Sequence, residues 1–489
     1  MNKTKIIATL WPSLDNEKKI IAAYKAGLNI VRFNFSHAEY KPTLKIKHMI
    51  DELNEKGKTK ISFMLDTKWP EIRIWDIDGV VRYKKWDVFK IYIKKEDISE
   101  PSSIRCDYPY ILQDLKVGKK ITIDSWIFKV KIIKKHTNAL EVKALNSGEV
   151  KSRRHVNLPW VKLRFDSLSQ KDIDDISFAA KNNFHFIAAS FIRNKSNVIE
   201  IRQLLDSQGG KNIKIISKIE NQEWIDNLDE IIYESDGIMV ARGDLWIEVP
   251  IEKLWKYQKE MIHKCKELGK FVIVATHFLE SMIELPFPTR AETSDVFHTV
   301  LEQPDCIMLS GETAVWKFPI QSIKMMSKVT REAEKTLVYK HKDFSDMWLR
   351  ERDVEKKHMI KSGIYLWEEL KAKALIVFTK TGKLARLASA YRPKLPVYAF
   401  TKFESTEKYT NILYWITPLF LPNWVQENYH KNLEFALKIL TEKKFISSND
   451  KIIVVNDIQK DDIEIPVLEV INMKDLKETL KSKKWGIFS

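Results

Sequence analysis

The alternation of short apolar strands with helical segments is the feature that most constrains the fold of this chain. Runs rich in β-branched residues recur through the first two thirds of the sequence, and stretches with helical apolar spacing, such as Gln170–Lys181, separate most of them. The expected strands are Lys5–Leu10, Asn29–Phe35, Ile61–Leu65, His185–Ser190, Ile213–Ile219, Gly237–Ala241, Phe271–Ala275 and Cys306–Leu309. Buried strands that alternate with helices are typical of a parallel sheet. Eight such units predict an α/β fold, a (β/α)8 or TIM barrel, with its active site at the carboxyl ends of the strands.

Two segments depart from this alternation. From about Trp69 to Trp160, short strands such as FKVKIIKK and LEVKAL alternate with turn residues, which predicts a small all-β domain inserted into the barrel. After the barrel, strands at Ala374–Phe378, Val397–Phe400 and Ile452–Val455 predict a C-terminal α/β domain. The expected domains are therefore residues 1–68 and 161–337 for the barrel, 69–160 for the insertion and 338–489 for the C-terminal domain.

Polar side chains follow several of the expected strands at their carboxyl ends. Because side chains alternate along a strand, residues two apart share a face. The groups that share a face in this way are Arg32, Asn34 and Ser36; Lys218 and Glu220; Val240, Arg242 and Asp244; Val274 and Thr276; and Met308, Ser310 and Glu312. Unpaired charges are rarely buried, so this set predicts a site at the barrel mouth. The alternative is a set of unrelated ion pairs that cap the strands.

Composition argues against several other classes of protein. Hydrophobic residues make up 44% of the chain, which is too many for a disordered protein, and we expect no membrane span because no apolar run is long enough. Cys106, Cys265 and Cys306 show no paired spacing, so a reduced, cytoplasmic protein without structural disulfides is expected. The formal charge is +16, but the lysines are scattered. Small anionic substrates are therefore expected rather than nucleic acid.

A series of motifs in a fixed order extends over nearly the whole chain. It includes AGLNIVRFNFSH, MLDTKWPEIR, NLPWVKL, IKIISKIENQE, SDGIMVARGDL, PTRAETSDV and IMLSGETA. With these motifs the chain resembles the pyruvate kinase family, strongly over residues 1–335 and more loosely beyond them. The resemblance implies a cytoplasmic enzyme of glycolysis that transfers the phosphoryl group of phosphoenolpyruvate to ADP, uses Mg²⁺ and K⁺, and forms a homotetramer.

The resemblance also implies roles for residues on the phosphoenolpyruvate side. Lys218 would stabilise the charge of the phosphoryl group during transfer, and Arg32 would contact the same group. Glu220 and Asp244 would hold Mg²⁺, which prefers oxygen ligands. The substrate carboxylate would lie on backbone N–H groups at a helix start, those of Ala241, Arg242, Gly243 and Asp244.

Further residues match the proton, nucleotide and potassium sites of that family. Thr276 would lie near the carbon that is protonated after transfer, and Ser310 and Glu312 would belong to a proton relay. The nucleotide would contact Asn34, His37, Arg73 and Arg154. Four oxygen donors match the K⁺ site, namely Asn34, Ser36, Asp66 and the Thr67 carbonyl, and Glu71 is the residue type that accompanies K⁺ dependence.

The sequence departs from the family pattern at a few positions. His277 stands where the family has glutamine, Ala38 follows Ser36-His37 where the family has glycine, and Arg154 replaces a lysine. The C-terminal domain has VVNDIQKDD instead of a glycine-rich effector loop, so a sugar-bisphosphate effector is not expected.

Tryptophan and glycine are present in unusual proportions, with 15 Trp and 14 Gly. Ten tryptophans stand where the family has glycine: Trp11, Trp69, Trp75, Trp86, Trp126, Trp160, Trp224, Trp246, Trp316 and Trp415. Ordinary divergence does not favour the bulkiest residue at turns that need glycine. The UGA triplet is read as glycine in some bacterial lineages, and our hypothesis is that these positions carry glycine in the native host.

Two other functions remain open at the sequence level. The first is a catalytically inactive family member that serves as a basic anion-binding scaffold, although Lys218, Glu220, Asp244, Thr276 and Arg32 are all retained. The second is a different barrel enzyme that uses phosphoenolpyruvate, which would need neither the inserted domain nor the potassium-site residues.

Overall fold

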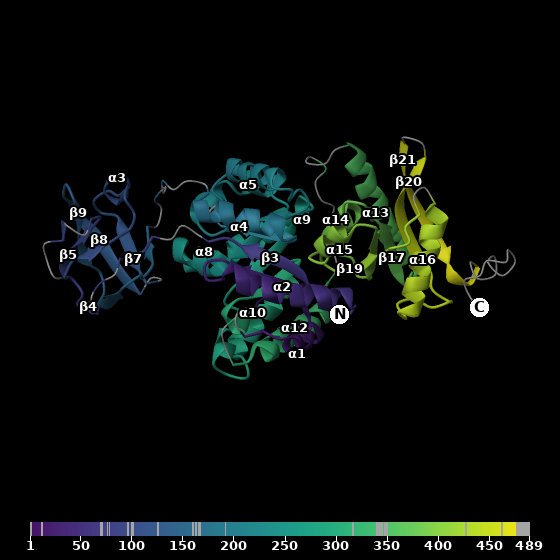
Figure 1. The fold of residues 1–489 in the computed structure, drawn as a ribbon, viewed down its shortest axis with the longest axis horizontal. Coiled ribbons are helices and arrows are strands. Elements are labelled where there is room, and N and C mark those ends of the chain that lie inside the picture. Colours follow the sequence, from purple (N-terminus) through teal and green to yellow (C-terminus); the bar gives the residue numbers. More distant parts are fainter. Residues whose placement is uncertain are drawn as a thin grey trace.

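The computed structural model describes residues 2–10, 13–68, 72–75, 77, 79–94, 97–98, 102–124, 127–158, 161, 164, 168–190, 192–314, 317–338, 346, 351–425, 428–460 and 463–475. Three bodies lie in a row, with the barrel between a small β domain and a C-terminal α/β domain (Figure 1). Within the described residues, no helix is long and apolar enough to cross a membrane.

The central body is a closed barrel of eight parallel strands in the order β1-β16-β15-β14-β13-β12-β3-β2. The strands are β1 (Lys5–Thr9), β2 (Leu28–Asn34), β3 (Ser62–Asp66), β12 (Phe186–Ala189), β13 (Lys214–Ile219), β14 (Gly237–Ala241), β15 (Phe271–Ala275) and β16 (Cys306–Leu309). Each of them overlaps one of the expected runs, so the predicted barrel is confirmed.

The two faces of the barrel strands belong to different cores. Outward side chains such as Val31, Leu65 and Val240 pack against the surrounding helices. Inward side chains such as Ile30 and Met64 fill the barrel and form one core that continues into the C-terminal domain. The middle of the barrel is thus apolar, and polar side chains stand on the same inward faces at the two ends of the strands, such as Lys5 and Ser62 at the amino ends and Lys218 at a carboxyl end.

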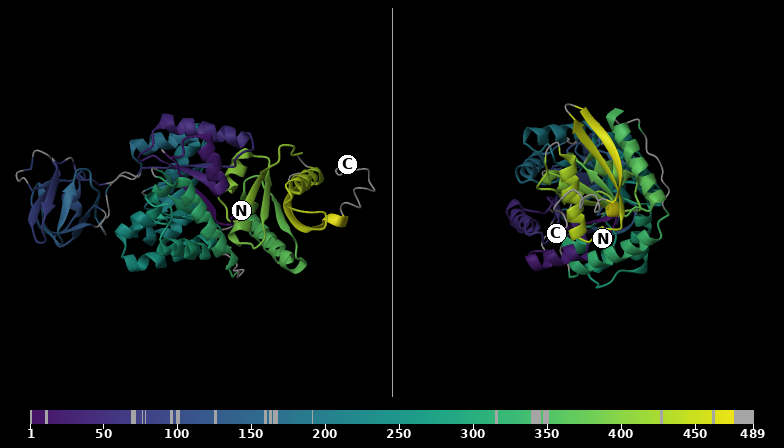
Figure 2. Two further views of the ribbon diagram at one scale, coloured as in Figure 1. Left: turned by 90° about the horizontal axis from the view of Figure 1, so that it is seen from below. Right: turned by 90° about the vertical axis from the view of Figure 1, so that its right-hand side faces the viewer.

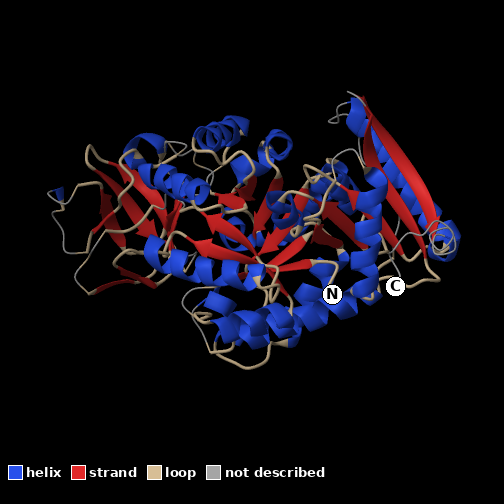
Figure 3. Cartoon of the chain, turned by 45° about the vertical axis from the view of Figure 1, so that its right-hand side comes forward, coloured by secondary structure: helices blue, strands red, loops and turns tan. Residues whose placement is uncertain are grey.

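Amphipathic helices surround the barrel strands, as Figure 3 shows in blue around red. The long ones are α1 (Glu17–Ala26), α2 (Tyr40–Glu55), α4 (Gln170–Lys181), α5 (Lys195–Ser207), α9 (Leu254–Glu267), α10 (Arg290–Leu301) and α12 (Pro319–Lys335). Shorter ones are α6 (Gln222–Asp226), α7 (Leu228–Glu234), α8 (Arg242–Glu248), η2 (Ile251–Lys253), η3 (Glu280–Ile283) and α11 (Gly311–Ala314). Side-chain capping boxes fix the starts of α4 and α10, where Ser169 and Thr289 bond reciprocally with the third residue of each helix.

The inserted domain lies beyond the carboxyl ends of the barrel strands and is separate from the helices around the barrel (Figure 2). Its six-stranded sheet has the order β11-β7-β8-β9-β5-β6, and β10 pairs with β4. The strands are β4 (Val80–Tyr83), β5 (Val88–Tyr92), β6 (Ile104–Arg105), β7 (Lys120–Ile123), β8 (Phe128–Lys135), β9 (Ala139–Ala144), β10 (Gly148–Lys151) and β11 (Val156–Asn157), with a short helix α3 (Ile111–Asp114). The rings of Tyr83, Phe89 and Phe128 stack within its own hydrophobic core.

The C-terminal domain is a five-stranded sheet in the order β19-β18-β17-β20-β21. Its elements are α13 (Glu351–Leu370), β17 (Ala374–Phe378), α14 (Lys383–Ala390), β18 (Val397–Thr401), α15 (Glu404–Thr410), β19 (Ile416–Phe420), α16 (Tyr429–Glu442), β20 (Lys451–Lys460) and β21 (Ile463–Asn472). The three strands expected from the sequence are present, and the two edge strands β19 and β21 were missed.

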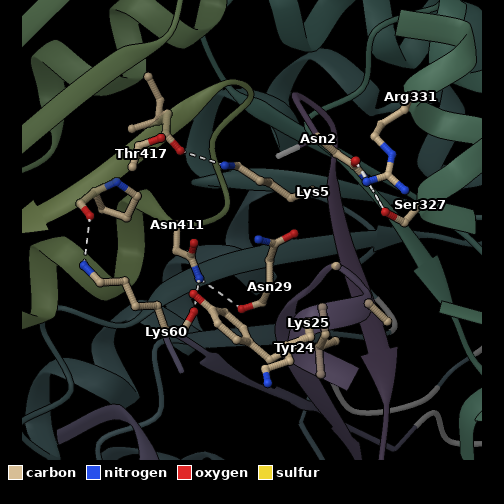
Figure 4. A pocket seen from close by; sticks show the side chains of 15 residues that line it. Asn2, Lys5, Tyr24, Lys25, Asn29, Lys60, Ser327, Arg331, Asn411 and Thr417 are labelled. Carbon is tan, nitrogen blue, oxygen red and sulfur yellow. Dashed lines mark hydrogen bonds between the residues drawn. The ribbon is translucent and has the colours of Figure 1, made fainter. Parts of the chain in front are cut away.

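The barrel and the C-terminal domain meet at the amino ends of the barrel strands. There a cavity of about 270 Å³ lies between them, and the basic side chains of Lys5, Lys25, Lys60 and Arg331 are among its lining residues (Figure 4). The Lys5 ammonium donates to the Ile416 carbonyl at 2.7 Å, and burial lowers the pKa of Lys5 to about 8. Polar contacts therefore tie the first barrel strand to the C-terminal sheet.

Two of the ten tryptophans in question have backbone conformations that favour glycine. Trp86 has φ 80° and is the third residue of a turn closed by the Asp87 N–H donating to the Lys84 carbonyl at 3.1 Å, and Trp415 has φ 58°. A bulky residue with such a φ is an outlier. Trp11, Trp69, Trp126, Trp160 and Trp316 lie outside the described residues.

Candidate active site

A cavity of about 170 Å³ opens at the carboxyl ends of the barrel strands, below the inserted domain. The lining residues predicted from the sequence are Arg32, Asn34, Ser36, His37, Thr67, Lys218, Glu220 and Asp244. Three more were not predicted: His155 and Asn157 from the end of the inserted domain, and Glu248 from the end of α8. Side chains from β2, β3, β13 and α8 thus converge as the barrel topology requires.

Four charged side chains form a continuous network on the inward faces of β2, β3 and β13. Asp66 Oδ2 accepts from Arg32 Nε at 2.6 Å, and Asp66 Oδ1 lies 3.2 Å from Lys218 Nζ. Lys218 Nζ lies 2.7 Å from Glu220 Oε1 and donates to Ser190 Oγ at 2.8 Å. The side chain of Lys218 is only 10% exposed, so its ammonium is held by its neighbours rather than by water.

Burial and mutual attraction shift the pKa values in this network. Burial works against the charge of Lys218, but Asp66, Glu220 and Asp244 outweigh it and raise the pKa of Lys218 above its usual value. Burial likewise opposes ionisation of Asp66, but Arg32 and Lys218 hold its pKa below the usual value. For Glu220 burial prevails over Lys218 and raises the pKa to about 8. A fixed cation therefore faces a carboxyl group that ionises near neutral pH.

The segment after β14 turns directly into α8, and this corrects the expectation from strand alternation. Because a helix begins at Arg242, its side chain does not align with Asp244 toward the cavity but points away from it, into the buried contact with α10. There it forms two bonds with Asp295, at 2.8 and 2.9 Å, and donates to the Thr276 carbonyl at 2.6 Å. Arg242 is thus a structural residue of the cavity wall.

Thr276 follows β15 in a left-handed conformation with φ 73°, and His277 has φ 55°. The Thr276 hydroxyl accepts from the Gly243 N–H at 2.7 Å, so Thr276 lies beside the start of α8. A β-branched residue at this φ is strained, and such strain tends to cluster at functional sites. Of the expected N–H groups for the substrate carboxylate, the amide of Gly243 therefore already has Thr276 as its partner.

The expected relay residues lie at the end of β16. Glu312 Oε2 accepts from the Ser310 N–H at 2.8 Å, and Glu312 Oε1 accepts from the Leu279 N–H at 3.3 Å. The Ser310 hydroxyl is buried and has no hydrogen-bond partner among the described residues. Ser310 and Glu312 are therefore adjacent, but they lie outside the lining of the cavity.

The acidic residues of the cavity fit a divalent cation. Glu220 and Asp244 line the same cavity, and Glu220 Oε2 is buried without a hydrogen-bond partner among the described residues. A hard ion held by two carboxylates and substrate oxygens would use that free oxygen. Asn34, Ser36 and Thr67 line the same cavity, and Asp66 belongs to the charged network through Arg32 and Lys218. Oxygen donors of this mix suit K⁺ chemically, although Asp66 is already paired with two cations. Glu71 lies outside the described residues.

Arg73 and Arg154 lie apart from the cavity, in the inserted domain. The Arg73 guanidinium donates to the Arg153 carbonyl at 2.7 Å, and Arg154 lies 3.2 Å from Asp124. Two partners of the charged network, Ser190 and Thr9, were not predicted from the sequence. Ser190 accepts from Lys218, and the Thr9 hydroxyl accepts from Arg32 at 2.9 Å. Strand alternation would have found both, since Thr9 follows Ile7 and Ser190 follows Ala188 on inward faces.

Comparison with known proteins identifies the family. Residues 1–323 match the model of the pyruvate kinase barrel domain, and residues 357–464 match that of the pyruvate kinase alpha/beta domain. A pyruvate kinase from Borreliella burgdorferi is 34% identical over 98% of both chains, and one from Staphylococcus aureus is 38% identical over 86% of this chain and 72% of its own. The crystal structure of a pyruvate kinase from Cryptosporidium parvum superposes with a TM-score of 0.88 at 32% identity and covers 96% of both chains. The chain therefore belongs to the pyruvate kinase family.

Proposed function

We propose that this chain transfers the phosphoryl group of phosphoenolpyruvate to ADP, giving pyruvate and ATP, in the cavity at the barrel mouth. The observation that carries the proposal is the position of Lys218. Its ammonium is buried, lies 3.2 Å from Asp66 and 2.7 Å from Glu220, and faces a cavity that also holds Arg32 and Asp244. Phosphoryl transfer depends mainly on fixed charges around the transferring group, and this cavity provides them.

Each residue of the cavity has a role that follows from its charge. Arg32 and Lys218 would bind the phosphoryl oxygens, and the fixed position of Lys218 means that little reorganisation is needed during transfer. Glu220 and Asp244 would hold Mg²⁺, which supplies positive charge to phosphate and carboxylate oxygens when bound. The amides of Ala241, Arg242 and Asp244 would contact the substrate carboxylate at the start of α8. Gly243, whose N–H bonds the Thr276 hydroxyl, would let the carboxylate approach closely because it has no side chain.

Proton delivery would come from the side of Thr276. Its hydroxyl lies against Gly243, beside the expected substrate carboxylate. Ser310 and Glu312, which are paired at the end of β16, would connect this position to solvent through water. A hydroxyl alone is a weak acid, so we assign the protonation to the relay rather than to one residue.

The nucleotide would lie between the barrel and the inserted domain. Asn34 and His37 line that side of the cavity, and Arg73 and Arg154 would reach it from the inserted domain. We propose K⁺ as the second cation, at Asn34, Ser36, Asp66 and the Thr67 carbonyl. We also propose the domain division, the homotetramer and the cytoplasmic location that are typical of the family. The proposed domains are the barrel (1–68 and 161–337), the insertion (69–160) and the C-terminal domain (338–489).

The test is pyruvate formation from phosphoenolpyruvate and ADP with Mg²⁺, with and without K⁺. The chain as written is compared with a chain in which the ten tryptophans are replaced by glycine. Activity that K⁺ raises supports the proposal. Lys218→Gln should lower kcat by about 10²–10³-fold, because one charged donor to the transition state is lost, whereas Lys211→Gln on the exposed surface should not. A folded glycine-containing chain without any turnover would favour the inactive scaffold instead.

A further inference from the structure

Glu248 is a barrel carboxylate that lies between two cavities at the junction with the inserted domain. On one side it lines the candidate active site with Asp244 and with His155 and Asn157 of the inserted domain. On the other side it lines a second cavity of about 440 Å³, together with Val249, Pro250 and Lys129 of β8. Glu248 therefore separates the active site from a cleft on the outside of the junction.

The partner of Glu248 belongs to the inserted domain. The Asn157 side chain hydrogen-bonds the Glu248 carboxyl group. Asn157 is part of β11, which pairs with β7 through Val156 with Ile123 and Asn157 with Thr122. The contact between Asn157 and Glu248 therefore joins the six-stranded sheet of the inserted domain to α8, the helix that carries Asp244.

Only one of the two polar groups of the Asn157 side-chain amide takes part in this contact. Its Oδ1 is buried and has no hydrogen-bond partner among the described residues. An ionised Glu248 only accepts and can bond the Asn157 NH₂ group, whereas a protonated Glu248 can also donate to Oδ1. Burial raises the pKa of Glu248 to about 7, against the opposing effects of Asn157 and His155. Both forms of the contact are therefore populated near neutral pH.

We propose that Glu248 is a positioning residue that sets the position of the inserted domain over the barrel mouth through Asn157, and thereby controls nucleotide affinity. The inference rests on the proposed function, in which the nucleotide lies between the two bodies. Although His155 and Asn157 also line the cavity, the residues proposed to bind phosphoenolpyruvate all belong to the barrel, on β2, β13 and α8, at the end of β14 and just after β15. Loosening the junction should therefore weaken ADP binding and leave phosphoenolpyruvate binding nearly unchanged.

Other charged groups surround Glu248 and enter the design of the test. They are Asp244 on α8, His155 just before β11, Lys129 on β8 and Glu252 on η2, and across the cavity Arg32, His37, Lys218 and Glu220. Glu252 lines the same outer cavity and is exposed, but does not line the active site. It is the matched control, because replacing it removes one negative charge from the junction without touching Asn157.

The experiment compares Glu248→Ala, Glu248→Gln and Glu252→Gln in the full chain with glycine at the ten positions. Loss of one hydrogen bond across the junction should raise the KM for ADP in Glu248→Ala by about 2–10-fold, while the KM for phosphoenolpyruvate stays within about twofold. Glutamine keeps an acceptor and supplies a permanent donor to Oδ1, so Glu248→Gln should bind ADP at least as well as the parent. Glu252→Gln should behave as the parent.

The pH profile gives a readout that a merely structural role would not change. Between pH 6 and pH 8 the parent loses the Glu248 proton and with it the bond to Asn157 Oδ1, so its KM for ADP should rise relative to that of Glu248→Gln. An equal pH dependence in both proteins, or an equal rise of both KM values in Glu248→Ala, would refute the proposal.

Calorimetric binding of Mg·ADP, at the same two pH values, separates this inference from the proposed function. If the parent binds Mg·ADP but forms no pyruvate, the proposed function fails, and the affinity ratios of the variants still decide the role of Glu248. If the parent turns over and Glu248→Ala binds Mg·ADP as tightly as the parent, the proposed function stands and the positioning role is wrong. Circular dichroism confirms that each variant is folded.

Discussion

At the scale of single residues, Trp86 and Trp415 pay a conformational cost that glycine would not. Their φ values of 80° and 58° place a large side chain in the left-handed region, where a residue with a Cβ loses about 1–2 kcal/mol. Trp86 is 55% exposed, and its ring lies under the ammonium groups of Lys85 and Lys143. These cation–π contacts offset part of the conformational cost. We expect Trp86→Gly and Trp415→Gly each to raise the free energy of unfolding by up to about 1 kcal/mol, measured by urea denaturation.

The control for these substitutions is Trp255→Gly in helix α9. Trp255 is also half-exposed, but it lies in the first turn of a helix, its ring faces the Arg242 guanidinium at 5.4 Å, and it does not stand at a family glycine. Glycine there should lower the stability by about 1 kcal/mol. If all three substitutions destabilise the protein, the left-handed turns accept tryptophan and the argument for glycine is lost. Peptide mapping of protein from the native host tests the decoding directly, since tryptophan found at position 246 would exclude it.

His185 makes stability depend on pH. Its half-buried ring stacks on Phe63, and Nδ1 accepts from the Phe63 N–H at 2.9 Å. Burial, together with Lys408 and Lys47, lowers the pKa of His185 well below 6.5. Below about pH 6.5, the pKa of an ordinary histidine, His185 binds a proton in the unfolded chain but not in the folded chain. The free energy of unfolding therefore falls as the pH falls, by up to about 1.4 kcal/mol per pH unit.

We therefore expect His185→Asn to flatten the loss of stability between pH 6.5 and 5.5. Asparagine offers an oxygen to the Phe63 N–H but does not titrate, so the slope should decrease by about 1 kcal/mol per pH unit even if the variant is less stable overall. Urea denaturation at several pH values gives the slope. His48→Asn, on the exposed face of α2, should leave it unchanged, and an unchanged slope in His185→Asn would contradict the assignment.

At the scale of elements, Arg242 connects the start of α8 to the end of β15. Its buried guanidinium bonds Asp295 of α10 at 2.8 and 2.9 Å and the Thr276 carbonyl at 2.6 Å. These bonds hold Thr276 in its left-handed conformation. Asp295→Ala should leave Arg242 free to move and misplace the Thr276 hydroxyl, lowering kcat by about 10–100-fold with little change in the KM for ADP.

The conservative variant decides whether the effect comes from the ion pair. Asp295→Glu keeps the charge and should recover part of kcat. Asp229→Ala, which breaks an exposed pair with Lys264, should have no effect on kcat. If Asp295→Ala keeps full kcat and the fold, the turn at Thr276 is held by other contacts.

The elements also show where sequence reasoning succeeds. The helix Gln170–Lys181 was predicted with both ends correct because its capping box and apolar spacing are local signals. Alternation along regular strands correctly grouped Arg32 with Asn34 and Lys218 with Glu220. It failed at Arg242, because the strand had ended and a helix had begun.

The remaining failures have physical reasons as well. His155, Asn157 and Glu248 enter the cavity from two separate bodies, and no periodicity within either segment indicates such a contact. The two strands that were missed are the edges of the C-terminal sheet, and they contain Pro418 and Pro466. Proline removes a strand signal in the sequence, and edge strands are where a sheet tolerates it.

At the scale of the whole molecule, one buried ion pair fastens the barrel to the C-terminal domain. Asp305, which precedes β16 at the amino end of the barrel, accepts from Arg392 Nη2 at 2.6 Å and from Arg392 Nη1 at 3.0 Å. It also accepts from the Val272 N–H of the barrel and the Tyr414 N–H of the C-terminal domain, each at 3.0 Å. Asp305 is 1% exposed and Arg392 is 4% exposed, so water does not solvate either charged group.

Removing one partner of such a pair leaves a buried charge without compensation, and that is costlier than the loss of the contact itself. Asp305→Ala should therefore lower the free energy of unfolding by about 3–5 kcal/mol, whereas Asp229→Ala at the surface should cost less than about 1 kcal/mol. The double variant Asp305→Ala with Arg392→Met removes both charges and should recover much of the loss. Urea denaturation of the three variants distinguishes these cases, and a second transition in Asp305→Ala would show that the C-terminal domain has separated from the barrel. If the double variant is no more stable than Asp305→Ala, the hydrogen bonds of Asp305 to Val272 and Tyr414, rather than its charge on Arg392, join the two domains.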